Sequence, residues 1–176
     1  MKTMITMLVF ALASVSSAFA SAEVECVKRA QREIRDMSDY SKVELCRRAI
    51  NTVPVDCYLG MQKIDRNFGA GDLLLVCAGV SDYAPLECVR TAKSNYELRR
   101  IENLSPVAEL CAYASNNEPV SCYEMARSNW HAGLSIHRSV ALCRGTTSTY
   151  PVECFKTAKK EGRLDELEAI RLCARY

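Results

Sequence analysis

The sequence predicts an all-α protein: an array of five antiparallel helix pairs, each closed by one disulfide, that stack like an α-solenoid. The first observation is the spacing of the ten cysteines. Long intervals of 20, 20, 23, 21 and 19 residues alternate with short intervals of 11 residues. This gives a repeat of about 30 to 34 residues, a period typical of helical solenoids. The other two observations are residue types that recur at fixed distances from the cysteines, and an N-terminal segment typical of exported proteins.

Residues 1–20 have the pattern of a secretory signal peptide. Lys2 supplies a positive charge, Met4 to Ala13 form a largely apolar stretch, and Ala18-Phe19-Ala20 resembles a cleavage site. We therefore expect a periplasmic or secreted protein with no membrane span once this segment is removed. An even number of cysteines in an exported chain indicates disulfides.

Each repeat is expected to begin with a helix that carries the first cysteine of the repeat. A proline stands three residues before this cysteine in four repeats, and proline is tolerated in the first turn of a helix. These prolines are Pro54, Pro85, Pro119 and Pro151. The residue four positions after the cysteine lies on the same helix face and is alanine in all repeats but the second, which allows close packing.

A second helix is expected to end at the second cysteine of each repeat. Eight residues before that cysteine stands a residue type preferred as an N-cap. The five expected caps are Ser38, Gly69, Asn103, Ser135 and Asp165. Asp165 and Glu168 have the spacing of a capping box. Apolar residues recur three and one positions before the cysteine, which predicts that this face of the second helix is buried.

The two helices and a polar connector complete each repeat, with expected boundaries near residues 23–51, 52–82, 83–116, 117–148 and 149–176. In an antiparallel hairpin the start of the first helix lies beside the end of the second. The expected disulfides are therefore Cys26–Cys46, Cys57–Cys77, Cys88–Cys111, Cys122–Cys143 and Cys154–Cys173. The rival scheme, which links each second cysteine to the next first one, would leave Cys26 and Cys173 at opposite ends of the array.

A recurring motif runs from Leu-Cys through a polar connector to Pro-Val-x-Cys, as from Leu142-Cys143 to Pro151-Val152-Glu153-Cys154. One disulfide per helix pair resembles the plan of the cysteine-rich Sel1-like repeat proteins exported by bacteria and, more loosely, the tetratricopeptide class. The resemblance lies in architecture, because the chain lacks the glycine-rich signature of Sel1-like repeats. It implies a curved helical scaffold for contacts with other proteins.

Charge and motif content favour a binding or structural role over catalysis. Without Lys2, the chain has 22 basic and 21 acidic residues, a balance that does not indicate a nucleic acid partner. The only histidines, His131 and His137, are six residues apart and are expected to lie in a loop as surface residues. We expect no catalytic, cofactor-binding or metal-binding residues. The alternatives are an exported enzyme acting on cell-wall or carbohydrate substrates, and a purely structural or toxin-like secreted protein.

The connectors are the candidate binding surface. They contain Tyr83, Tyr113 and Tyr150, together with Asn51, Thr52, Asn116, Asn117, Thr146 and Thr147. Tyrosine with Ser, Thr and Asn is a composition that suits recognition of a protein or cell-surface component. If the connectors line one edge of the stack, the tyrosines are expected to form a continuous strip. The alternative is that the connectors are polar only because they are exposed.

Overall fold

The computed structural model describes residues 21–128 and 132–174, and in this part of the chain every regular element is a helix. The first helices of the repeats are residues 21–33, α3 (Val53–Ile64), α5 (Ala84–Ser94), α7 (Glu118–Arg127) and α9 (Tyr150–Lys160). The second helices are α2 (Asp39–Cys46), α4 (Ala70–Cys77), α6 (Ser105–Cys111), α8 (Ile136–Cys143) and α10 (Glu166–Cys173). A 3₁₀ turn, η1 (Leu98–Arg100), precedes α6.

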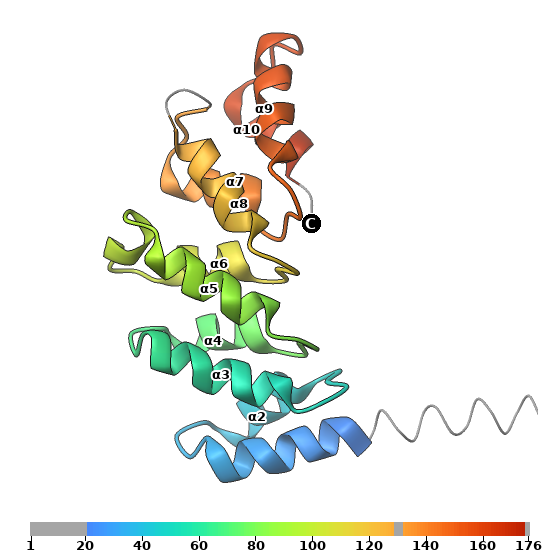
Figure 1. The fold of residues 1–176 in the computed structure, drawn as a ribbon. Coiled ribbons are helices and arrows are strands. Elements are labelled where there is room, and N and C mark those ends of the chain that lie inside the picture. Colours follow the sequence, from blue (N-terminus) through green and yellow to red (C-terminus); the bar gives the residue numbers. More distant parts are fainter. Residues whose placement is uncertain (1–20, 129–131, 175–176) are drawn as a thin grey trace, which may run out of the picture.

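The helices form a two-layer stack (Figure 1). First helices pack on first helices, with α3 against α5, α5 against α7 and α7 against α9. Second helices pack on one another in the same order from α2 to α10. The turns within the first three repeats lie along one edge of the stack, and the connectors between repeats lie along the opposite edge (Figure 1). The predicted array of antiparallel helix pairs is confirmed.

Each helix pair is closed by its own disulfide, between the first turns of the first helix and the last residue of the second. The bonds join Cys26 to Cys46, Cys57 to Cys77, Cys88 to Cys111, Cys122 to Cys143, and Cys154 to Cys173. The Cα atoms of the pairs are 5.5–5.7 Å apart, within the usual range for disulfides. A closed loop of this length contributes about 3 kcal/mol to the free energy of unfolding. Helices of 7 to 12 residues need such support.

The helix starts follow the sequence signals, with one exception. Pro54, Pro85, Pro119 and Pro151 each occupy the second position of a first helix. Ser38, Gly69, Ser135 and Asp165 are the N-caps of their second helices, and Asp165 forms the expected capping box with Glu168.

The exception is the third repeat, where the N-cap is Leu104 and the prediction of Asn103 is wrong. The Asn103 side chain instead accepts a hydrogen bond from the Ser105 N–H, 3.0 Å away. Pro106 fixes a helical backbone at the second position of α6 and so shifts the start. This repeat has the longest interval between its cysteines, and the extra residues form η1, whose Leu98 is buried.

The core is a continuous row of equivalent positions from neighbouring repeats. The residue four positions after each first cysteine is buried in all five repeats: Ala30, Met61, Ala92, Ala126 and Ala158. The expectation that residues three and one before the second cysteine are buried is wrong at the two ends of the stack. Val43 and Leu172 are exposed there, because no neighbouring repeat among the described residues covers them.

The predicted signal peptide, residues 1–20, lies outside the described residues. Within residues 21–128 and 132–174, no helix has both the length and the apolar character needed to cross a bilayer. Five disulfides indicate an oxidising compartment outside the cytoplasm.

Candidate protein-binding surface

Four connectors join the repeats along one edge of the stack, at residues 47–52, 78–83, 112–117 and 144–149 (Figure 1). They share one backbone course, in which the second residue has a left-handed conformation. The φ angles are 61° at Arg48, 67° at Gly79, 63° at Tyr113 and 63° at Gly145. Glycine is favoured there because it has no Cβ. Two of the four connectors therefore place a large side chain where the backbone favours glycine.

Hydrogen bonds hold the second connector against the end of α2 and against the first connector. The Gly79 N–H donates to the Leu45 carbonyl at 3.0 Å, and the Asn51 amide donates to the Ser81 carbonyl at 2.8 Å. A Cβ at Gly79 would lie 2.7 Å from the Arg47 carbonyl oxygen. The connectors thus approach closely, and their backbone course is fixed by the stacking of the repeats.

Much of the polar character of the connectors serves to start the next helix. In the last four repeats, a side-chain oxygen six residues before the first cysteine accepts a hydrogen bond from the N–H two residues further on. The acceptors are Asn51, Asp82 and Asn116 at 2.9 Å, and Ser148 at 3.3 Å. This shared position was not predicted from the sequence, although it is visible once the cysteines are aligned.

Two threonines in the connectors also have structural contacts. Thr52 Oγ1 accepts a hydrogen bond from Arg29 at 2.9 Å. Thr146 is buried, and its hydroxyl donates to the Ser148 carbonyl at 2.8 Å. Asn51, Thr52, Asn116 and Thr146 therefore each have a role in the fold.

The three candidate tyrosines are exposed but do not form the expected continuous strip. Tyr83 is the N-cap residue of α5, Tyr113 is the left-handed residue of its connector, and Tyr150 is the first residue of α9. Their exposed fractions are 47%, 81% and 53%. Because they occupy different places in their repeats, they line three separate grooves.

Tyr113 lines a groove that crosses three successive connectors, here called the connector groove. Its other residues are Arg47, Arg48, Ala78, Gly79, Val80, Ser81, Asp82, Pro85, Ala114 and Ser115. The exposed Arg47 and Arg48 come from the first of these connectors, Val80 from the second and Tyr113 from the third. Arg47 forms an ion pair with Glu44 at 3.2 Å. No described residue binds the Tyr113 hydroxyl. The groove combines two arginines, the carboxylate of Asp82, apolar surface and an aromatic ring.

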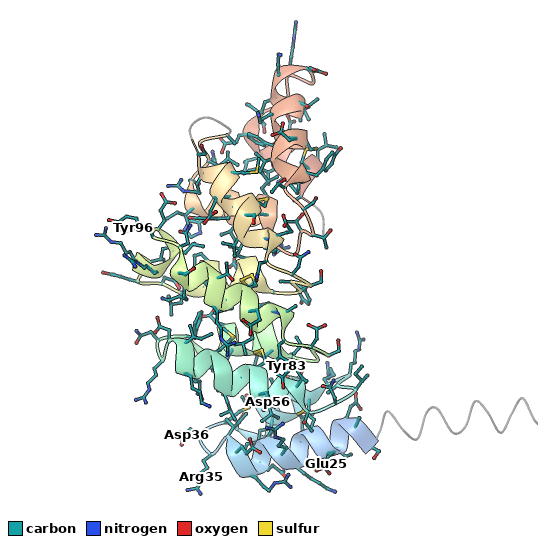
Figure 2. All side chains as sticks on the ribbon, viewed as in Figure 1. Glu25, Arg35, Asp36, Asp56, Tyr83 and Tyr96 are labelled. Atoms are coloured by element: carbon teal, nitrogen blue, oxygen red, sulfur yellow. A yellow bond between two sulfur atoms is a disulfide. The ribbon has the colours of Figure 1, made fainter. Side chains whose placement is uncertain are left out.

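Tyr83 belongs to a polar groove across the first helices of the first three repeats. Its hydroxyl donates to Asp56 at 3.2 Å, and Asp56 accepts two hydrogen bonds from Arg29, at 2.5 and 2.9 Å (Figure 2). The hydrogen bonds from Arg29 hold the pKa of Asp56 below its usual value. This carboxylate therefore links the first and second repeats through an ion pair with Arg29.

The opposite edge of the stack, which carries the turns within repeats, also links neighbouring repeats. Lys93 binds Asp65 at 2.8 Å, and Arg127 binds Glu97 at 2.8 Å. The hydrogen bond from Lys93 lowers the pKa of Asp65. Tyr96 lies on this edge, exposed and stacked with Arg99 and Arg100 (Figure 2).

The structure describes one of the two histidines that were expected in a loop. His137 is an exposed residue in the first turn of α8, so the expectation that it lies in a loop is wrong. His131 lies outside the described residues. Among the described residues, no group of three or more His, Cys, Asp or Glu side chains is arranged to hold a metal ion.

Comparisons of the chain with protein-family models, curated proteins and solved structures found no match. The resemblance to the Sel1-like class thus rests on the shared plan of disulfide-closed helix pairs.

Proposed function

We propose that this protein is an exported scaffold that binds an extended acidic segment of another protein in the connector groove. The observation that carries the proposal is the left-handed backbone of Arg48 and Tyr113. The equivalent residues, Gly79 and Gly145, show that glycine serves this position in the fold. A side chain with a Cβ is less stable there by about 1–2 kcal/mol.

Neither residue recovers this cost by packing. Arg48 is exposed, and Tyr113 is among the most exposed large side chains of the described chain. Residues held in a costly backbone conformation cluster at binding sites, where the side chain serves a purpose other than stability. Both of these side chains line the same groove.

The chemistry of the groove selects the class of partner. Two neighbouring guanidinium groups suit carboxylates, which arginine binds through paired hydrogen bonds. Tyr113 offers a large rigid contact area with few rotatable bonds, and Val80 and Pro85 add apolar surface. An extended segment with acidic residues at one end and an apolar or aromatic residue further along fits this order.

The signal peptide pattern and the disulfides support a location outside the cytoplasm. Residues 1–20 act as a signal peptide and are removed, and residues 21–176 form the five repeats with the boundaries expected from the sequence. The protein then works in the periplasm or outside the cell, where its disulfides are stable.

A library of random short peptides tests the proposal. The oxidised protein should enrich peptides with acidic residues, and the variants Arg48→Gly and Tyr113→Gly should lose this enrichment while retaining the helical circular dichroism spectrum. The matched control is Tyr96→Ser, which removes an exposed tyrosine from the opposite edge. Enrichment that is unchanged in both glycine variants, or that shows no preference for acidic peptides, contradicts the proposal.

A further inference from the structure

The two ends of the stack expose apolar side chains whose equivalents are buried in the other repeats. Val24, two residues before the first cysteine of its repeat, is 53% exposed. Its equivalents are at most 3% exposed: Val55, Leu86, Val120 and Val152. Leu172, one residue before the second cysteine of the last repeat, is 65% exposed. Its equivalents are at most 1% exposed: Leu45, Val76, Leu110 and Leu142.

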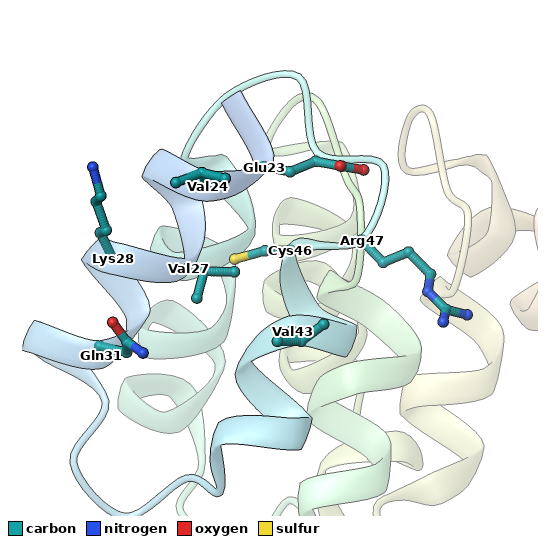
Figure 3. A pocket seen from close by; sticks show the side chains of 8 residues that line it. All are labelled: Glu23, Val24, Val27, Lys28, Gln31, Val43, Cys46 and Arg47. Atoms are coloured by element: carbon teal, nitrogen blue, oxygen red, sulfur yellow. The ribbon is translucent and has the colours of Figure 1, made fainter. Parts of the chain in front are cut away.

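At the N-terminal end, exposed apolar side chains line a groove between residues 21–33 and α2. Val24 and Val27 come from the first of these helices and Val43 from the second, and the three valines line the opening (Figure 3). Lys28 stands at its rim (Figure 3). We call this hollow the N-terminal groove.

At the other end a second groove lies between α9 and α10. Its lining includes Thr157, Glu161 and Leu172. Cys154 also lines it and is partly exposed, whereas the other four first cysteines are fully buried. We call this hollow the C-terminal groove. Both end faces thus expose apolar side chains, whereas most repeat arrays close their ends with a polar outer face.

The shapes of the two end faces are related by the repeat itself. Inside the stack, Leu86 packs against Gly60 of the preceding repeat so closely that a Cβ on the glycine would lie 2.6 Å from the leucine Cδ2. The positions equivalent to this pair at the two ends are Val24 and Thr157, a small residue in each groove. The end faces therefore carry the equivalents of the two positions that meet between the second and third repeats.

Charge complementarity supports the same pairing. Asn95, the C-cap residue of α5, donates a hydrogen bond to Glu124 of the next repeat at 2.8 Å. The equivalent positions at the ends are Glu161, the C-cap residue of α9, and Lys28. These two residues have opposite charges and lie in the two end grooves.

One equivalent pair opposes the contact. Arg138 forms an ion pair with Glu166 of the next repeat. The positions equivalent to this pair at the ends are Glu168 and Asp39, which have the same charge. The end-to-end contact is therefore weaker than a contact between repeats within the chain, and it depends on protein concentration.

We propose that the N-terminal groove of one copy of this protein stacks on the C-terminal groove of a second copy, continuing the repeat array from one chain into the next. The two faces lie at opposite ends of the elongated stack (Figure 1). A head-to-tail contact of this kind does not close into a dimer, so it produces linear chains whose length grows with concentration. The inference goes beyond the proposed peptide binding, because it uses neither Arg48 nor Tyr113.

Sedimentation equilibrium of the oxidised protein tests the proposal. The average mass should rise above that of one chain as the concentration increases. Lys28→Glu and Glu161→Lys should each weaken the association about tenfold, because each places like charges across the interface. A mixture of the two variants should recover association, since the C-terminal groove of the Glu161→Lys variant then meets the N-terminal groove of the Lys28→Glu variant with opposite charges. Leu172→Glu should abolish it.

Matched controls separate these effects from general changes in charge or folding. Leu75→Glu places the same charge on an exposed leucine of a second helix inside the array, and Arg66→Glu reverses a charge in an interior turn. Both should leave the association unchanged.

Two results overturn the proposal: residues 21–176 with the mass of one chain at all concentrations, or association that survives both Lys28→Glu and Leu172→Glu.

Discussion

Replacing Tyr113 with glycine separates the stability of the connector from its proposed binding role. Relief of the left-handed backbone at a φ of 63° is expected to stabilise the fold by about 1–2 kcal/mol. The added freedom of glycine in the unfolded chain opposes this by about 0.4–1 kcal/mol. Because the side chain is 81% exposed, little packing is lost. The free energy of unfolding should therefore rise by about 0.5 kcal/mol.

Thermal unfolding followed by circular dichroism measures this change, which corresponds to about 1–2 °C in the midpoint for a chain of this size. Affinity for an acidic peptide selected by the wild type should fall about fivefold or more, the loss expected when truncation of a contact costs about 1 kcal/mol. Stabilisation together with weaker binding is a combination that a packing residue would not give.

The control is Gly145→Ala, which has the same φ of 63° and no atom closer to the new Cβ than 3.7 Å. It should lower the free energy of unfolding by about 1 kcal/mol. A midpoint lowered by about 3 °C or more in Tyr113→Gly would show that the tyrosine packs against the connectors and refute the reasoning. A Gly145→Ala variant as stable as the wild type would refute the cost of about 1 kcal/mol assigned to a Cβ at this left-handed position.

Three further predictions concern the stack itself. Gly71→Ala, with no atom within 4 Å of the new Cβ, should stabilise the protein by about 0.4–1 kcal/mol in urea unfolding. Gly60→Ala should not stabilise it, because its Cβ meets the buried Leu86. An equal gain in stability at both sites would contradict the close packing of Gly60 against Leu86. The pKa of Asp65 is lowered in the folded state, so its contribution is present at neutral pH and is lost as the pH falls below about 4 through the folded pKa. Asp65→Asn should therefore reduce the difference between the urea midpoints at neutral and acidic pH, and an unchanged difference would exclude a contribution from this carboxylate. Ser139 Oγ is buried without a hydrogen-bond partner among the described residues, so Ser139→Ala should raise the free energy of unfolding by about 1 kcal/mol. A lower free energy of unfolding in this variant would show that the hydroxyl has a hydrogen-bond partner in solution.

The helix pairs could be predicted because each repeat has similar local sequence signals at fixed distances from its cysteines. Pro54 and its equivalents start the first helices, and Ser38 and Asp165 cap second helices by hydrogen bonds within a few residues. Signals of this kind depend on the local chain alone. Asn103 failed as a cap because Pro106, three residues later, moved the helix start.

The connector groove could not be predicted, because it depends on how three repeats stack. The left-handed position was also hidden, since it holds glycine in two repeats and Arg48 or Tyr113 in the others. The three tyrosines share a residue type and a place in the connectors, and this gave no indication that their different offsets from the cysteines place them in different grooves. Tyr113 was identified as a candidate for its residue type, and its backbone conformation is what distinguishes it from Tyr83 and Tyr150.

The confinement of every disulfide to one repeat determines how the protein responds to tension. A force applied to the chain ends passes through each sulfur–sulfur bond and bypasses the residues between the paired cysteines. Between Cys26 and Cys173, only the four connecting segments, each with 10 residues between crosslinked cysteines, are free to lengthen, and each reaches an extended length of at most about 40 Å. A protein pulled between two exported partners would therefore lengthen by a short, fixed distance, because the residues inside the five disulfide loops cannot extend.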